Sequence, residues 1–219
     1  MSTRQKMQQG FTLIEMIVSV AIFSIVATIT VGALLILIGT NQQLQTEQNI
    51  MTNLSFALDS MTREIRTGTN YYCVARPNYN SSGPFNEGGG HESLGLSTQD
   101  CSEGNSSPSN NLQGVSVAES GDSITGSGAN RILYYYDSGD SSGGSGVGRI
   151  MRRVGDGPME AIVSSGLDIV NAEFFVTGSA AGDNVQPTVT IVIEAQDLND
   201  TSGKTYEMQT TVVQRDLDI

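Results

Sequence analysis

The 219-residue sequence has few of the residues that enzymatic and nucleic-acid-binding sites need. It contains no Trp, one His and two Cys, and its 11 Lys and Arg stand against 23 Asp and Glu, a net charge of −12. Clustered cations are needed to neutralise phosphates, so a nucleic-acid partner is not expected. Two cysteines cannot form a four-cysteine zinc site, and His91 alone in a Gly-rich loop argues against Ser-His-Asp or Cys-His catalysis. We therefore expect no enzyme, no cofactor and no metal site.

The sequence does contain one long apolar run, residues 11–38, in which Glu15 is the only charged residue. A membrane-spanning helix needs about 20 apolar residues, so the run is long enough to cross a bilayer. Arg4 and Lys6 precede it, and the next basic residue is Arg63. The positive-inside rule predicts a single-pass protein with residues 1–10 in the cytoplasm and everything after about Thr40 outside.

Two ordinary interpretations of this run are available. A secretory signal peptide has an apolar core of about 7–15 residues and a small-x-small cleavage site, and neither fits here. A plain signal anchor fits the length but gives no reason for Glu15. A carboxylate at the start of a membrane helix is costly and is usually functional.

The junction QQG-FTLIE resembles the type III signal of type IV pilins and type II secretion pseudopilins. The resemblance implies that a prepilin peptidase cleaves after Gly10 and methylates the new amine of Phe11, and that Glu15 is the family's characteristic fifth mature residue. Glu15 lies one helical turn after Phe11. In a filament it would pair with the Phe11 amine of a neighbouring subunit. The implied partners are the prepilin peptidase, other pilin or pseudopilin subunits and an inner-membrane assembly platform.

A helical pattern continues beyond the membrane run, through residues 39–67. Five apolar residues recur at spacings of three and four: Ile50, Leu54, Leu58, Met61 and Ile65. This spacing predicts an amphipathic extension of one helix from about 11 to 66, ended by Gly68 and loosened near Gly32 and Gly39. The apolar stripe would pack on a following sheet, or alternatively form a dimerising coiled coil.

Residues 68–130 are predicted to be a loop region, because they are rich in Gly, Ser and Asn. Cys73 and Cys101 fall in it. Outside the membrane a disulfide is permitted, so we favour a Cys73–Cys101 bond over two unpaired thiols. Val115–Val117 and Ser123–Thr125 are short strand candidates.

The C-terminal part, residues 131–219, is predicted to be an antiparallel sheet. Residues 131–136 and 149–154 read as a hairpin, and residues 167–177, 188–195 and 205–213 as strands, with Val189, Ile191, Ile193 and Ala195 sharing one face. No β-α-β period appears, so the fold class is α+β, one long helix packed on a sheet. The whole pattern resembles minor pilins and J-type minor pseudopilins.

For two other clusters of charged and polar residues we favour a structural role over a binding role. Arg149, Arg152 and Arg153 are expected on an exposed strand edge, with a partner surface as the alternative. Asp197, Asn199 and Asp200 are expected in a solvated turn, with calcium as the alternative.

The sequence thus favours a structural filament subunit, minor rather than major. The alternatives are a filament-tip adhesin and a membrane-anchored extracellular β-domain. Pilus and secretion pseudopilus are not separated. We expect the chain first in the inner membrane and then in an extracellular or periplasmic filament.

Overall fold

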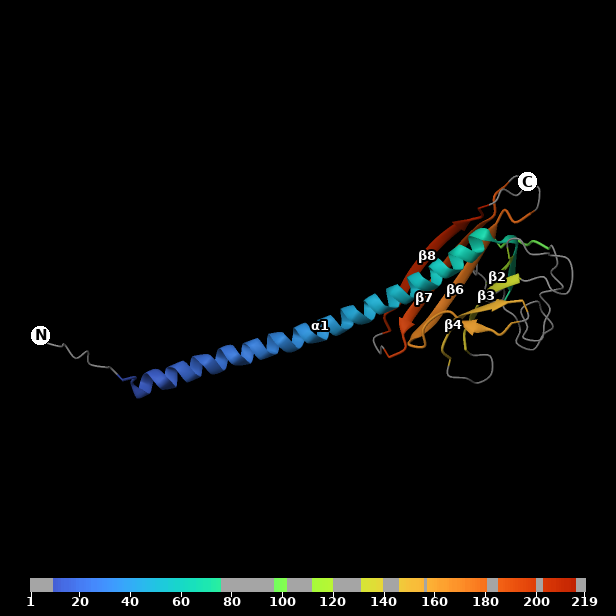
Figure 1. Cartoon of the computed structure of the whole chain (residues 1–219). Coiled ribbons are helices and arrows are strands. Elements are labelled where there is room, and N and C mark those ends of the chain that lie inside the picture. The colour runs from blue at the N-terminus through green and yellow to red at the C-terminus, as the bar shows by residue number, and fades with distance from the viewer. Residues whose placement is uncertain are drawn as a thin grey trace, which may run out of the picture. The chain divides into compact units, whose positions relative to one another are not determined.

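The computed structural model describes residues 10–75, 97–101, 112–119, 131–139, 146–155, 157–180, 185–199 and 203–215. The chain divides into two units, Met1–Glu47 and Gln48–Ile219. The described residues form one helix and eight strands (Figure 1). Their bounds are α1 Leu13–Thr67, β1 Thr69–Ala75, β2 Leu112–Ala118, β3 Arg131–Asp137, β4 Arg149–Val154, β5 Glu160–Ala161, β6 Leu167–Thr177, β7 Thr188–Asp197 and β8 Tyr206–Val213. The predicted α+β class, one long helix with antiparallel strands after it, is confirmed.

The single helix α1 is 55 residues long and begins and ends within two residues of the predicted bounds. It is continuous through Gly32 and Gly39, where an added Cβ would meet nothing within 4 Å. The expected loosening at these glycines is therefore not present. The helix ends at Thr67, and the N–H of the next residue, Gly68, donates to the carbonyl of Glu64. An added Cβ at Gly68 would lie 2.8 Å from the Cβ of Val117, so the glycine also allows β2 to approach closely.

The part of α1 that belongs to the second unit packs into that unit's core. All five residues of the predicted apolar stripe are buried there, and Ala57 joins them. Each large apolar side chain removed from water in this way contributes about 1.5–3 kcal/mol. Because the stripe is buried against strands of the same chain, it is not available for the coiled coil considered as an alternative.

One sheet of the second unit has five strands in the order β1-β2-β3-β4-β5, all antiparallel. Its first two strands lie within residues 68–130, which we had expected to be loop. That prediction was wrong for β1 and too short for β2, of which only Val115–Val117 was expected. Two register shifts interrupt the β1–β2 pairing and weaken the alternating pattern that a sequence search relies on. The candidate strand Ser123–Thr125 lies outside the described residues.

The other sheet has three antiparallel strands in the order β6-β7-β8. Alternate residues of β7, from Val189 to Ala195, are completely buried, as the sequence pattern predicted. A register shift between Ile169 and Asn171 in β6 moves the buried positions by one residue, so that Leu167, Ile169 and Phe174 all face the core. The predicted antiparallel strands are thus present, but they form two sheets rather than one.

The two sheets meet along the edge of β6 that β7 leaves free. At one point Cys101 and Val176 exchange both backbone hydrogen bonds, with N···O distances of 2.9 and 3.2 Å. At another, the Ile169 N–H donates to the Gly148 carbonyl at 3.0 Å. An added Cβ at Gly148 would lie 1.9 Å from the Ile169 carbonyl oxygen, so only glycine fits this crossing.

Candidate processing and assembly site

Gly10 and Phe11 form the junction at which the sequence predicts cleavage. Both are exposed, and 78% of the surface of Phe11 is accessible. An added Cβ at Gly10 would meet nothing within 4 Å. The described part of the chain therefore gives Gly10 no steric reason to be glycine, and any such requirement comes from a molecule that binds the junction. Residues 1–9, with Arg4 and Lys6, lie outside the described residues.

Thr12 caps the N-terminus of α1, a role that the sequence analysis missed. The Glu15 N–H donates to the Thr12 hydroxyl oxygen at 3.3 Å and to the Thr12 carbonyl oxygen at 3.2 Å. Thr12 and Glu15 stand in the Thr-x-x-Glu order of a capping box, and that pattern is the signal that could have identified the cap. The junction therefore lies just outside the first turn of a capped helix.

Glu15 lies in that first turn, where the partial positive charge of the helix N-terminus stabilises its negative charge. Its carboxylate has no hydrogen-bond or ion-pair partner within the described residues. A carboxylate in apolar surroundings is costly unless it is paired, so a partner from another molecule would stabilise it. The Phe11 nitrogen is in peptide linkage to Gly10, so it is an uncharged amide here and becomes a cation only if that bond is cleaved.

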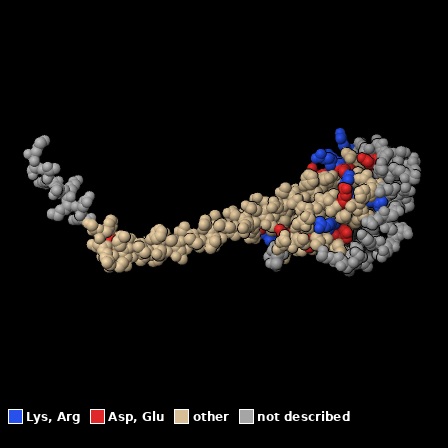
Figure 2. All heavy atoms as spheres, turned by 60° about the horizontal axis from the view of Figure 1, so that its bottom comes forward, with Lys and Arg blue, Asp and Glu red and all other residues tan. Residues whose placement is uncertain are grey.

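The helix that follows is suited to lipid. By length and composition α1 could cross a membrane: an 18-residue window has a mean hydropathy of 2.7, and none of that window is buried. Hydroxyl groups within the run are satisfied locally, because Ser24, Thr28 and Thr30 each donate to the backbone carbonyl four residues earlier, at 2.8 Å. Figure 2 shows this part of the helix almost entirely in tan, the colour of residues other than Lys, Arg, Asp and Glu.

A polar cluster in the second unit ties α1 to the five-stranded sheet. Arg152 on β4 donates from Nε and Nη2 to the two carboxylate oxygens of Glu64, at 2.9 and 2.8 Å, and the Tyr134 hydroxyl on β3 donates to Glu64 as well. The bond to Glu64 raises the pKa of Arg152, and burial together with Glu64 raises the pKa of Tyr134. At neutral pH Arg152 therefore stays charged and Tyr134 stays neutral, and the contact between Arg152 and Glu64 is bidentate.

This cluster corrects the expectation that Arg149, Arg152 and Arg153 lie on an exposed strand edge. β4 pairs with β3 on one side and with the short β5 on the other. Arg153 is buried, and only 28% of the Arg152 side chain is exposed. A helix carboxylate far away in the sequence changed the environment of Arg152, and no local pattern in residues 149–154 signals that partner.

Arg131 is a second buried cation that the sequence analysis did not identify. Its guanidinium donates to the Ser116 hydroxyl at 3.1 Å, to the Asn70 carbonyl at 3.1 Å and to the Ser97 carbonyl at 3.2 Å. Burial lowers the pKa of Arg131 to about 10. The side chain thus connects β1, β2 and the segment 97–101 from the first residue of β3.

A disulfide joins Cys73 on β1 to Cys101, the pairing that the sequence favoured. Both cysteines are buried. Beside them, the Asp100 carboxylate accepts the N–H groups of Gly178 and Ser179, at 3.0 and 2.9 Å, just after β6. The segment 97–101 is therefore fixed covalently to one sheet and through hydrogen bonds to the other.

The remaining candidates carry no site within the part of the chain that is described. The Asp197 carboxylate accepts the Asn199 N–H at 2.6 Å, which is the geometry of a polar turn. Asp200 lies outside the described residues, as does His91. Among the residues described, no group of three or more His, Cys, Asp or Glu side chains is placed to hold a metal ion.

Comparison with known proteins adds one match. The family model described as the prokaryotic N-terminal methylation motif matches residues 5–31, which include the junction, Thr12, Glu15 and the first part of α1. No curated protein and no solved structure matches the chain. The match covers the N-terminal signal and leaves the β-rich unit without a counterpart. The chain carries the N-terminal methylation signal of type IV pilins and pseudopilins.

Proposed function

We propose that this protein is a structural rather than a catalytic molecule: a minor subunit of a type IV pilus or a type II secretion-like filament. In this proposal the prepilin peptidase cleaves after Gly10 and methylates the amine of Phe11. The processed chain then enters a filament through α1, with its β-rich unit on the outer, non-cytoplasmic side. The methylation motif at residues 5–31 supports processing and assembly with other pilin-type subunits.

The observation that carries the proposal is the junction itself. An exposed Gly-Phe bond stands immediately before a capped helix whose following residues are apolar and exposed. Nothing near Gly10 in the described chain requires a glycine, whereas a peptidase needs room at the bond it cleaves. The apolar part of α1, which none of the described residues covers, is suited first to lipid and then to the apolar helices of other subunits.

Glu15 supplies the register in this mechanism. Cleavage removes Arg4 and Lys6 and leaves the Phe11 amine as the cation at the start of the helix. A neighbouring subunit could then neutralise the Glu15 carboxylate with that amine, and only one offset along the helices would bring the two charges together. The pairing offsets the desolvation cost of both groups, whereas other offsets would leave them unpaired.

The net charge supports a subunit that is present in few copies over one that forms most of the filament. Without Arg4 and Lys6 the chain keeps 9 basic residues against its 23 acidic ones. Many copies side by side would repel one another through their outer faces, although salt screens exposed charges beyond about 8–10 Å. One or a few copies among other subunits would meet less repulsion.

The first experiment is to determine the N-terminal residue and the mass of the protein from the membrane and filament fractions of its host. We expect a chain that begins at Phe11 and carries one added methyl group. Gly10→Val should give a chain that keeps Met1, while Gly39→Val, at an equally open glycine, should be processed normally. An intact Met1 in the wild-type protein, in cells with an active prepilin peptidase, would refute the proposal.

A second experiment tests assembly apart from processing. Glu15→Gln removes the charge but keeps the side-chain size, so the variant should be cleaved and methylated yet be largely lost from sheared filaments. Glu207→Gln, the same change on an exposed residue of β8, is the matched control. Filament content equal to that of the wild type would show that the Glu15 charge does not set the register.

A further inference from the structure

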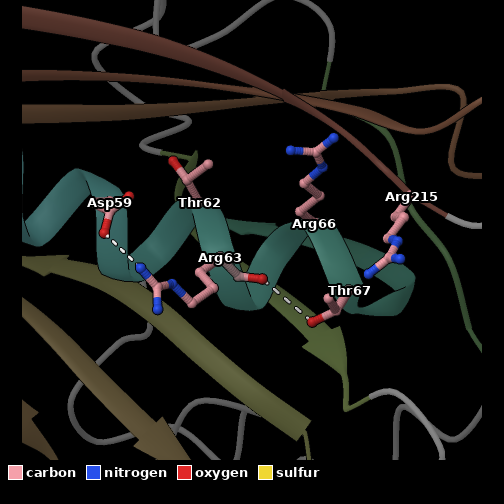
Figure 3. Close-up of a pocket in the computed structure, with 6 residues that line it drawn as sticks. All are labelled: Asp59, Thr62, Arg63, Arg66, Thr67 and Arg215. Carbon is pink, nitrogen blue, oxygen red and sulfur yellow. Dashed lines mark hydrogen bonds and ion pairs between the residues drawn. The ribbon is translucent and has the colours of Figure 1, made fainter.

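The side of α1 that faces away from the core carries two adjoining hollows. One is lined by Asp59, Thr62, Arg63, Arg66, Thr67 and Arg215 (Figure 3). The other is lined by Phe56, Asp59, Ser60, Arg63 and Glu64. Asp59 and Arg63 belong to both, so the two hollows form one continuous surface within the second unit. We call the set Phe56, Arg63, Arg66 and Arg215 the arginine face.

The arginine face holds positive charge that the described chain does not use internally. Arg63 is paired with Asp59 at 3.1 Å, but both side chains are mostly exposed, at 79% and 68%. The guanidinium groups of Arg66 and Arg215 are exposed and have no hydrogen-bond or ion-pair partner in the described part of the chain. By contrast, Arg131 and Arg153 are buried and Arg152 is bound to Glu64. In a chain of net charge −12, such a group of available cations is unusual.

Phe56 adds an apolar anchor beside these charges. Its surface is 73% exposed, although Leu54, Ala57 and Leu58 around it in the sequence are buried. Phe56, Ser60 and Arg63 follow one another at helical spacings of four and three, so they share one face of α1. Single exposed apolar residues are common on surfaces. Phe56 shares its hollow with Arg63, and the adjoining hollow holds Arg66 and Arg215. Aromatic and arginine residues are enriched at the centres of protein interfaces.

The geometry favours a broad acidic partner over a small anion. In Figure 3 the side chains of Arg63, Arg66 and Arg215 point in different directions, so one small anion could not contact all three. Arg63 is already engaged by Asp59, and the C-terminal end of a helix repels anions placed at its last carbonyls. An extended surface with several carboxylates could instead meet the arginines separately while covering Phe56.

We propose that the arginine face docks onto a carboxylate-bearing surface of a neighbouring filament subunit. This inference rests on the proposed function, because it assumes that the chain enters a filament. The charge of the face supports the choice of partner: three arginines stand there beside the single carboxylate of Asp59, so the hollow attracts an acidic surface and repels a basic one. Contact through Phe56, Arg66 and Arg215 would therefore select both the partner and the face that it meets.

The test measures how much of each variant enters filaments. Arg215→Glu, Phe56→Ala and Arg66→Gln are expressed in a host strain that lacks the wild-type gene, and the amount in the sheared filament fraction is divided by the amount in the membrane. Lys204→Glu is the control for Arg215→Glu, since it makes a basic-to-acidic change at another exposed cation. Leu198→Ala is the control for Phe56→Ala, since Leu198 is also an exposed apolar residue.

We expect Arg215→Glu and Phe56→Ala to lower the filament fraction about tenfold, which corresponds to about 1.4 kcal/mol. Arg66→Gln should lower it less, because it removes a charge without reversing it, and both controls should stay close to the wild type. All variants should keep a methylated Phe11 and the oxidised Cys73–Cys101 pair. These two readouts show that a loss comes neither from failed processing nor from failed folding.

Three outcomes would overturn the inference, and they differ from one another. Wild-type filament content in both Arg215→Glu and Phe56→Ala would show that the face is not an interface. Loss with Phe56→Ala alone would show that the partner is not recognised through its acids. If the wild-type protein itself never appears in filaments, the proposed function fails, and the inference fails with it.

Discussion

Removing the disulfide should reveal how firmly the two sheets depend on the segment 97–101. We consider Cys73→Ala together with Cys101→Ala, which leaves two small apolar side chains in buried positions. The bond closes a sequence separation of 28 residues. The chain-entropy relation gives about 3–4 kcal/mol for a loop of this size. For a protein of about 150–250 residues, that loss lowers the Tm by about 6–16 °C.

The assay is thermal unfolding of the detergent-solubilised full chain, followed by the circular dichroism of the strands. Reductant should lower the Tm of the wild type to near that of the double variant and leave the variant unchanged. Because Cys101 and Val176 exchange backbone hydrogen bonds, both amides should also exchange faster with solvent in the variant.

A loss below about 1 kcal/mol would refute this account, because it would show that the disulfide does not restrict the unfolded chain as the loop-closure relation requires. Faster exchange of the amide hydrogen of residue 101 with unchanged exchange of the Val176 amide would show which contact holds the segment 97–101. It would mean that the Asp100 hydrogen bonds to Gly178 and Ser179, and not the disulfide, keep the segment on β6.

Three further predictions concern the second unit. Gly148→Ala should destabilise the protein by about 2–3 kcal/mol, because its Cβ would overlap the Ile169 carbonyl, whereas Gly166→Ala, with open space around it, should be near neutral; denaturant unfolding compares the two. Glu64→Gln should cost about 1–3 kcal/mol, since it weakens a half-buried bidentate pair, whereas Asp59→Asn, which breaks an exposed pair, should cost less than about 0.5 kcal/mol; equal losses would contradict the ranking. The raised pKa of Tyr134 means that its contribution to stability is complete below pH 10 and is lost as the pH rises further. Tyr134→Phe should therefore flatten the decline in stability above pH 10. An ultraviolet titration of wild type and variant should show Tyr134 as a late-ionising tyrosine.

The parts of the fold that sequence analysis predicted are those whose signals are local. The helix was predicted to within two residues at each end, because a long apolar run and a three-four spacing can both be read without knowing any partner. β7 was predicted with its buried face, since Val189, Ile191 and Ile193 alternate with more polar residues. The methylation signal is equally local, and the family model matches the same residues.

The parts that were missed depend on distant partners. β1 was assigned to loop because its pairing with β2 is irregular and bridges residues about 40 positions apart, between Cys73 and Val115. The way in which the two sheets meet depends on contacts at Ile169 and Val176 that no strand pattern contains. The capping role of Thr12 is an exception, because its signal was present in the sequence and was overlooked in favour of Glu15.

The arginines show most clearly why composition alone could not decide the use of charge. Arg152, Arg153 and Arg66 are chemically identical, and each stands next to polar or charged residues in the sequence. Arg152 is paired with Glu64, Arg153 is buried and Arg66 is exposed to solvent, because the strands and the end of the helix give them different neighbours. A chain this rich in acid could have neutralised every cation internally. Within the residues that the structure describes, Arg66 and Arg215 nevertheless have no side-chain partner, and Phe56 of the same face is exposed. Another subunit that completes this surface would explain both observations, so variants on the arginine face and variants at Glu15 should separate two different steps of assembly.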